Sequence, residues 1–239
     1  MTYKNVIFLF FCFGFMVFLA LIAQKQNHQK QTLNIEIIFE KKPYILNDSV
    51  VNKLLTQNQN QSFYKVKDSL VLSEVEVALE QNEVVENAEV FLKPSGVIGV
   101  KVTERKPFFL VEDTLKYFVD QKAERFPFYE KYDEILPLFR GPLPEDRMQE
   151  VVQFFTQFEQ DNFIQSELRA LSFNEGNYFI TLRSYPFKII FGDSYRLKEK
   201  IKKLKIFCAF QRAQDTLKGY NVINLKYKNQ VVAQNTLVL

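Results

Sequence analysis

Residues able to support catalysis or metal binding are few in this sequence. The chain has two cysteines and one histidine, and His28 lies in a polar stretch without neighbouring partners. Cys208 follows a helical pattern of apolar residues, and no histidine in the later part of the chain could serve as its base. Cys208 is therefore interpreted as a small core residue. Because so few cysteines and histidines are present, the sequence predicts no metal site and no cofactor.

Charged residues provide two further candidates. Carboxylates are abundant, so a glycosidase pair stays open, although no local feature singles out two of them. The run KEKIKKLK at 198–205 could bind nucleic acid or anionic lipid, but it interleaves with an apolar stripe and reads as the solvated face of a helix. Lysine and arginine total 31 against 28 acidic residues, which is a weak basic excess. We predict no catalytic residues, no nucleic-acid binding and no small-molecule substrate.

An uncharged apolar segment, NVIFLFFCFGFMVFLALIA, occupies residues 5–23. As a helix it would extend roughly 28 Å, close to the ~30 Å hydrocarbon thickness of a bilayer. A cleaved signal peptide ending at Ala23 is the alternative, but its apolar region usually has only ~7–15 residues. We therefore predict an uncleaved transmembrane helix, preceded by residues 1–4 and followed by a polar tether at 24–32. The flanking lysines do not settle the orientation.

Residues 33–104 carry the pattern of a compact β-α-α-β-β unit. Residues 33–39 alternate at period two and predict a strand. Ser73 and Glu76 match an S-x-x-E capping box, which predicts a helix start. Two alternating strands between residues 88 and 102 flank Pro-Ser-Gly, which predicts a hairpin. Two helices on one face of a three-stranded sheet would make an α+β unit.

A second unit is predicted from residue 105 to residue 239, because Pro107 interrupts regular pairing. It mixes short strands with two longer helices, so the fold class of the whole chain is α+β with a mostly antiparallel second sheet. The expected strands are 108–111, 115–119, 135–139, 168–173, 178–182, 187–191 and 222 to about 233. The expected helices begin near Pro144, and at Asp193 or Ser194.

Several motifs resemble the FtsQ/DivIB family of cell-division proteins. The matching stretches are EVAL at 76–79, VVENAEV at 84–90 and GVIGVKVTERKP at 96–107, which resemble the POTRA domain of that family. The family's larger β domain begins with an element that residues 117–120 resemble, although Ala123 replaces the expected glycine. Two later stretches, PLFRG at 137–141 and NLKY at 224–227, resemble other strands of that domain. The order of these motifs along the chain carries the resemblance.

The resemblance implies a non-enzymatic scaffold of the division machinery. Residues 1–4 would be cytoplasmic and residues 5–23 would span the inner membrane. Residues 33–104 would form the POTRA domain and residues 105–239 the β domain, both periplasmic and located at the division septum. The implied partners are FtsB/DivIC-like and FtsL-like proteins and other divisome components. In this family a partner adds a strand to a sheet edge near the C-terminus.

The last predicted strand is where such an addition is expected. Apolar and polar residues alternate from Ile223 to Lys228, so one face can pack on the core while an edge offers unpaired N–H and C=O groups. The resemblance places Lys226 and Tyr227 at partner-contacting positions. The predicted partner-binding residues are Val222, Asn224, Leu225, Lys226, Tyr227, Lys228, Asn229 and Gln230. An ordinary edge strand protected by its lysines is the alternative.

Two other functional classes stay open. A POTRA-containing accessory of envelope translocation or secretion would usually show several such units in tandem or a following β-barrel. An anchored cell-wall hydrolase would need a catalytic pair, and no local feature of the sequence singles one out. The division scaffold is the interpretation that accounts for most of the chain.

Overall fold

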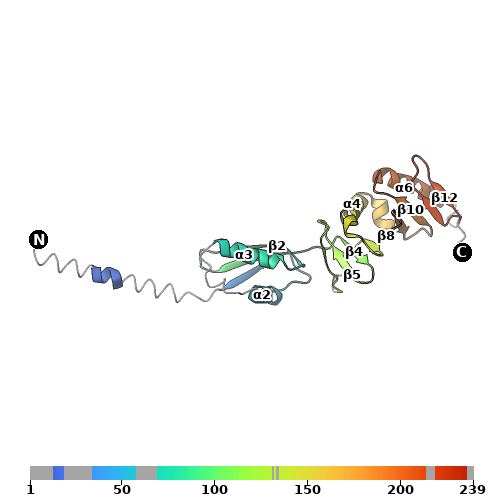
Figure 1. The fold of residues 1–239 in the computed structure, drawn as a ribbon. Helices are drawn as coiled ribbons and strands as arrows, with labels where there is room; N and C mark the ends of the chain where they lie inside the picture. The colour runs from blue at the N-terminus through green and yellow to red at the C-terminus, as the bar shows by residue number, and fades with distance from the viewer. Residues whose placement is uncertain are drawn as a thin grey trace, which may run out of the picture. The chain divides into compact units, whose positions relative to one another are not determined.

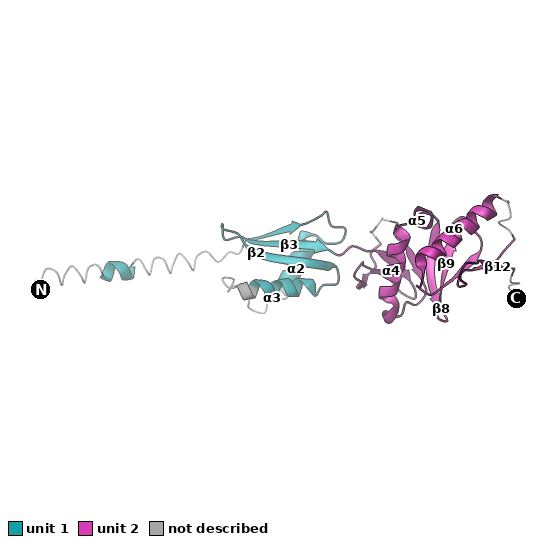
Figure 2. Cartoon of the chain, turned by 90° about the horizontal axis from the view of Figure 1, so that it is seen from above, with its two compact units in different colours: residues 1–104 teal, residues 105–239 magenta. Residues whose placement is uncertain are grey.

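The computed structural model describes residues 13–18, 34–57, 69–130, 132, 135–213 and 219–235. The chain divides into two compact units, residues 1–104 and 105–239 (Figure 2). Most of the predicted membrane segment lies outside the described residues, and the part within them, residues 13–18, is helical. Among the described residues, no helix combines the length and the apolar character needed to cross a bilayer.

Among the described residues from 34 to 104, the first unit has three strands and two helices, which follow one another in the predicted β-α-α-β-β order (Figure 1). They are β1 (Ile35–Phe39), α2 (Asp48–Gln57), α3 (Ser69–Glu80), β2 (Val85–Leu92) and β3 (Ile98–Glu104). The sheet order is β1-β3-β2, with β1 parallel and β2 antiparallel to β3. A Pro-Ser-Gly turn joins β2 and β3, and Gly96 there has φ +83°, a value that glycine adopts without steric cost. Helix and strand residues share the core: Val51, Leu55, Val75, Leu79, Ile98, Val100 and Val102 are buried.

Glutamates of this unit bind backbone amides of other segments. The predicted capping box is wrong, because α3 begins at Ser69 and therefore runs through Ser73. Glu76 instead accepts a hydrogen bond from the amide of Val90 in β2, at 2.7 Å. Glu104, the last residue of β3, accepts hydrogen bonds from the three consecutive amides of Tyr44, Ile45 and Leu46. The carboxylate of Glu104 thus holds the segment that leads into α2.

The second unit is a mixed α+β domain built on one long sheet. Its strands are β4 (Phe109–Glu112), β5 (Lys116–Val119), β6 (Arg125–Pro127), β7 (Leu138–Arg140), β8 (Leu168–Asn174), β9 (Asn177–Leu182), β10 (Lys188–Gly192), β11 (Val222–Asn224) and β12 (Val232–Gln234). Its helices are the short η2 (Glu145–Arg147), α4 (Met148–Glu159), α5 (Asn162–Glu167) and α6 (Leu197–Ala213). The strand order is β12-β11-β10-β9-β8-β7-β4-β5-β6. Antiparallel pairs outnumber parallel ones, as predicted.

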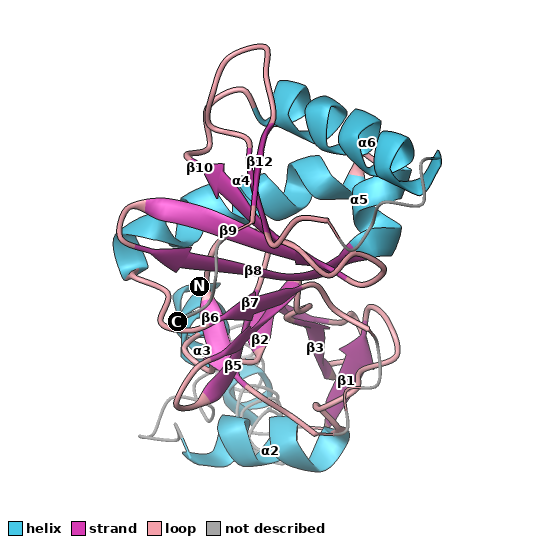
Figure 3. Cartoon of the chain, turned by 90° about the vertical axis from the view of Figure 1, so that its right-hand side faces the viewer, coloured by secondary structure: helices cyan, strands magenta, loops and turns pink. Residues whose placement is uncertain are grey.

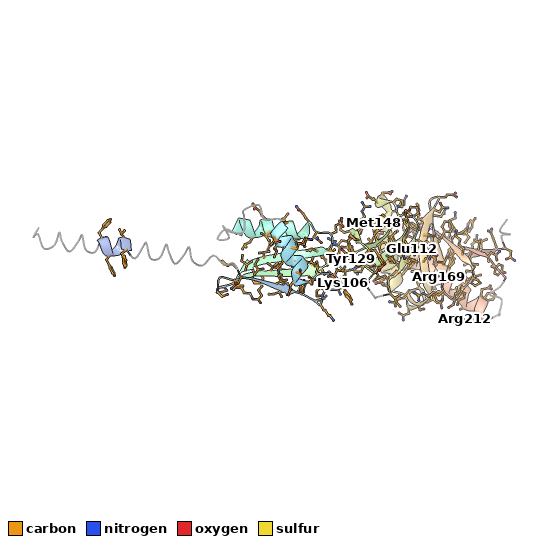
Figure 4. The ribbon with its side chains drawn as sticks, turned by 90° about the horizontal axis from the view of Figure 1, so that it is seen from below. Lys106, Glu112, Tyr129, Met148, Arg169 and Arg212 are labelled. Carbon is orange, nitrogen blue, oxygen red and sulfur yellow. The ribbon has the colours of Figure 1, made fainter. Side chains whose placement is uncertain are left out.

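The helices of this unit cover the sheet and enclose an aromatic core. Figure 3 shows α4, α5 and α6 on one side of β8, β9 and β10. Met148, at the start of α4 and labelled in Figure 4, is buried, as is Cys208 on α6. Much of the abundant phenylalanine is used here: Phe109, Phe139, Phe154, Phe155, Phe158 and Phe191 are buried. The rings of Phe154 and Phe191 lie 5.7 Å apart between centroids, within the range of favourable aromatic contact.

A buried carboxylate organises the turn between β5 and β6. Asp120 is 4% exposed and accepts hydrogen bonds from the amides of Lys122 and Glu124, each at 2.8 Å. Its second oxygen forms an ion pair with Arg105 at 2.5 Å. Ala123 stands where the resemblance predicts a glycine, and it has a left-handed φ of +67°. The turn therefore forms without the expected glycine, but with a residue that is sterically disfavoured there.

We expect Ala123→Gly to stabilise the second unit by about 1 kcal/mol. A left-handed conformation costs an L-residue with a Cβ roughly 1–2 kcal/mol, and glycine removes this cost. The greater conformational freedom of glycine in the unfolded chain offsets part of the stabilisation. Denaturant titration of the two proteins would measure the difference. The control is Ala209→Gly, at an exposed position inside α6, which should instead destabilise the protein by about 1 kcal/mol. Destabilisation by both changes would contradict the assignment of strain to Ala123.

Candidate partner-binding surface

The end of the sheet differs from the predicted single strand from Val222 to about Ala233. This segment forms two strands, β11 and β12, and β11 lies between β10 and β12. The prediction that the strand beginning at Val222 is a sheet edge is therefore wrong. The chain turns after β11 because the side chain of Asn224 accepts a hydrogen bond from the amide of Lys226 at 3.0 Å, and Asn229 adopts a left-handed φ of +58°.

The backbone of β11 is used on both sides. Leu225 donates its N–H to the carbonyl of Ile190 in β10, at 2.9 Å. Because successive residues of a strand direct their N–H and C=O groups to opposite sides, Asn224 and Val222 direct theirs toward β12. An added strand would thus find no unpaired backbone groups on β11.

The outer edge of this end of the sheet is β12. In the antiparallel register Val222 lies opposite Gln234, and Asn224 lies opposite Val232. Gln234 and Val232 therefore direct their backbone groups toward β11. Ala233, between them, directs its N–H and C=O outward. In the described part of the chain β12 has β11 as its single neighbour, so Ala233 offers one donor and one acceptor to an added strand.

The connection between β11 and β12, residues 225–231, is here called the β11–β12 loop. The ammonium group of Lys203, on α6, donates to the carbonyls of Leu225 at 3.0 Å, Tyr227 at 2.6 Å and Gln230 at 3.4 Å. Burial lowers the pKa of Lys203, but its three carbonyl partners suit a cationic donor. One side chain of α6 therefore fixes the path of the loop beside β12.

The predicted partner-binding residues are distributed unequally over this region. Leu225 is fully buried in the core, and Val222 and Asn224 are half-buried in β11. The remaining predicted residues are exposed on the β11–β12 loop: Lys226, Tyr227, Lys228, Asn229 and Gln230. The ring of Tyr227 stands out because the residue is 48% exposed although it is large and aromatic. The structure thus brings an exposed loop next to the outer edge of β12, which has β11 as its one neighbour among the described strands.

Lys226 is held back against its own domain. Its ammonium group lies 3.3 Å from the amide oxygen of Asn177. Its aliphatic stem crosses Gly192, where an added Cβ would approach Lys226 Cγ to 2.7 Å. Gly192 has φ +81°, so both the backbone conformation and the lysine stem favour glycine there. Lys226 therefore shapes the surface, whereas Tyr227 is free to contact a partner.

Three residues of the edge, Val232, Ala233 and Gln234, are absent from the predicted set. The alternation of apolar and polar residues continues past Asn224 and conceals the break between the strands. The signal that could have revealed it is the Lys228-Asn229 pair, because asparagine tolerates the left-handed conformation that turns require. A break at Asn229 would have separated β12 from β11.

The other chemical candidates are explained by the fold. Cys208 is fully buried, as predicted for a core residue, and burial raises the pKa of its thiol to about 12. The basic run of α6 is not a uniform solvated face, because Lys200 is buried and pairs with Asp193 at 2.5 Å. Among the described residues, no group of three or more histidine, cysteine, aspartate or glutamate side chains could hold a metal ion.

The second unit is an α+β domain with a strand edge beside an exposed loop, and exposed sheet edges are the surfaces that strand addition uses. The chain belongs to the FtsQ/DivIB family, because the family model described as "FtsQ/DivIB, C-terminal related" matches residues 106–234, more than half of the chain. This finding confirms the resemblance, and the match ends at the last residue of β12. The family consists of non-enzymatic cell-division proteins. No curated protein matches the sequence.

Proposed function

We propose that this protein is a membrane-anchored scaffold of the division machinery, and that a partner strand pairs with the outer edge of β12. The observation that carries this proposal is the outward N–H and C=O of Ala233 on a strand with one neighbour in the described residues. Membership of a division family supplies the cellular role. The partners are FtsB/DivIC-like and FtsL-like proteins, together with other divisome components.

The proposed topology follows the sequence and the family. Residues 5–23 anchor the chain in the inner membrane, with residues 1–4 in the cytoplasm and the folded units in the periplasm at the septum. Residues 24–32 are a tether, residues 33–104 a POTRA domain and residues 105–239 the β domain. The β-α-α-β-β order and the three-stranded sheet of the first unit support the POTRA assignment. The uncharged run of apolar residues supports the anchor.

Recognition of the partner combines backbone and side-chain contacts. A strand added to β12 would gain hydrogen bonds that depend little on its sequence, so other contacts must supply specificity. The exposed ring of Tyr227 and the neighbouring Lys228 lie on the β11–β12 loop, next to that edge. Lys203 holds this loop in one path, so less conformational entropy is lost when the partner binds.

Tyr227→Glu is expected to weaken partner binding by about tenfold or more while leaving the fold intact. The ring is half exposed, so little core packing is lost, whereas an apolar contact with the partner is replaced by a charge. Titration of the purified chain with an FtsB/DivIC-like protein would measure the change. Tyr227→Phe is the control and should bind within about threefold of the parent. Unchanged binding by the glutamate variant would show that Tyr227 lies outside the interface.

Depletion in cells tests the cellular role and separates the alternatives. Loss of a division scaffold should give filaments that continue to elongate without septa. Normal septation with a secretion defect would favour the translocation accessory, and hydrolysis of peptidoglycan by the purified chain would favour the wall hydrolase. Identification of the proteins that co-purify with the full chain would then establish the partner.

A further inference from the structure

The first unit has a sheet edge at β2, and the backbone pairing identifies the groups that face outward there. Lys93 donates its N–H to the carbonyl of Val97 at 2.8 Å, across the β2–β3 hairpin. The backbone groups of Phe91 and Glu89, two and four positions before Lys93, therefore also face β3. The backbone groups of the residues between them face away from β3. Ala88 and Val90 are two of these alternate residues, and their amides point to the open side of β2.

Both of these amides are bound by side chains of α3. Val90 donates to Glu76 Oε1 at 2.7 Å, and Ala88 donates to Glu80 Oε1 at 3.1 Å. The spacing makes this double contact possible. Four residues of helix rise about 6 Å, and two residues of strand rise about 6.8 Å. The spacing of Glu76 and Glu80 along α3 therefore matches the spacing of the Val90 and Ala88 amides along β2.

These carboxylates obstruct strand addition in two ways. An incoming strand needs the amides of Ala88 and Val90 as donors, but both are already occupied. Its own carbonyl oxygens would also approach the carboxylate oxygens of Glu76 and Glu80, and both groups are acceptors that cannot bond to each other. A polypeptide could pair with β2 only after displacing two charge-assisted hydrogen bonds.

The sheet of the second unit has a different obstruction at β6. The backbone N–H of Asp120 donates to the carbonyl of Glu124 at 3.0 Å. In the same register Phe118 lies opposite Phe126. Pro127, the next residue of β6, therefore directs its nitrogen outward, where proline has no N–H to offer. In the described residues, β12 shows neither a carboxylate bound to its outer amide nor a proline facing outward. Two carboxylates thus obstruct the β2 edge and a proline obstructs the β6 edge, whereas β12 has neither obstruction among the described residues.

We propose that Glu76 and Glu80 close the β2 edge against pairing with a second copy of this chain. The strand is suited to self-pairing once it is uncovered, because it contains Val85 and Val90 and ends in the exposed Phe91 and Leu92. In an antiparallel pair of two β2 strands centred on Ala88, the two copies are related by a two-fold axis. The outward N–H and C=O groups of each copy then meet those of the other. This register places Glu89 beside Asn87 of the second copy, so no like charges face each other directly.

The test compares three forms of the full chain in detergent by sedimentation at increasing concentration. The Glu76→Ala/Glu80→Ala double variant should self-associate at least about tenfold more strongly than the parent, because two donors are exposed per copy. The Glu76→Gln/Glu80→Gln variant retains the acceptor oxygens and should behave like the parent. A folded double-alanine variant whose association equals that of the parent would overturn the proposal.

Two further measurements connect any association to β2. Adding Val90→Pro to the double-alanine variant removes an outward donor and should restore the behaviour of the parent; association that persists would place the contact elsewhere and overturn the proposal. Hydrogen exchange at the amides of Ala88 and Val90 should slow with concentration in the double-alanine variant but not in the parent. If the double variant does not fold, Glu80→Ala alone provides the same comparison, with a smaller expected increase in association and with one exposed amide to follow.

Discussion

Ala233→Pro is expected to weaken binding of an FtsB/DivIC-like partner by about 30-fold or more without unfolding the protein. The substitution removes the outward N–H of β12 and places a ring where the added strand would lie. Loss of one or two hydrogen bonds and imperfect packing corresponds to about 2 kcal/mol. The amides of Val232 and Gln234, which face β11, are untouched, so the edge strand itself should stay paired. Titration with the partner measures the loss.

The controls separate the amide from the side chain. Ala233→Val keeps the N–H while adding bulk comparable to proline, and it should bind almost like the parent. Gln234→Pro removes an amide that faces β11, so it should lower the free energy of unfolding as well as binding. If Ala233→Pro binds as tightly as Ala233→Val, strand addition at β12 is excluded, while contacts through Tyr227 would remain to be tested by its own variant.

Asp120→Ala is expected to destabilise the second unit by about 3 kcal/mol. The carboxylate is 4% exposed and binds Arg105, itself largely buried, and two amides of the β5–β6 turn. Removing one member of a buried ion pair usually costs ~3–5 kcal/mol, because the other charge loses its partner in a medium of low polarity. Denaturant titration would measure the loss of stability.

An exposed ion pair of the same unit is the matched control for Asp120. Glu145 pairs with Arg125 at 3.3 Å, and both side chains are more than half exposed. Glu145→Ala should change the free energy of unfolding by no more than about 0.5 kcal/mol. Asp120→Asn keeps an oxygen for the turn amides and should have an intermediate effect. Equal effects of Asp120→Ala and Glu145→Ala would contradict a special role for the buried carboxylate.

Local patterns predicted the larger elements of the fold because those elements bury one face. Alternation identified β2 and β3, and the Pro-Ser-Gly turn between them was visible in the sequence. The apolar stripe identified α4 after Pro144. Ser73 and Glu76 misled us because the capping rule considers only the helix, whereas in the structure Glu76 binds an amide fourteen residues away. A local motif cannot reveal a competing partner that tertiary structure brings close.

Two short elements, β6 and α5, escaped prediction. β6 and α5 have too few residues for a period to emerge, and the pairing of β6 depends on the Asp120 turn. At the candidate site, the alternation placed Tyr227 on the core-facing side of a strand, and the resemblance placed it at a partner contact. In the structure Tyr227 is exposed on a loop that Lys203 of α6 holds in place. Three hydrogen bonds from a residue about 24 positions away cannot be read from the strand pattern itself, so the true edge at Ala233 was missed.

The boundary between the two units falls between two adjacent residues, and each of them is bound by side-chain contacts within its own unit. Glu104 is held by three amides of the first unit, and Arg105 is held by Asp120 of the second. One peptide bond therefore joins a residue held by the first unit to a residue held by the second. If the proposed membrane anchor and a bound partner pull on the chain, we expect the tension to act on these two side-chain attachments at the junction.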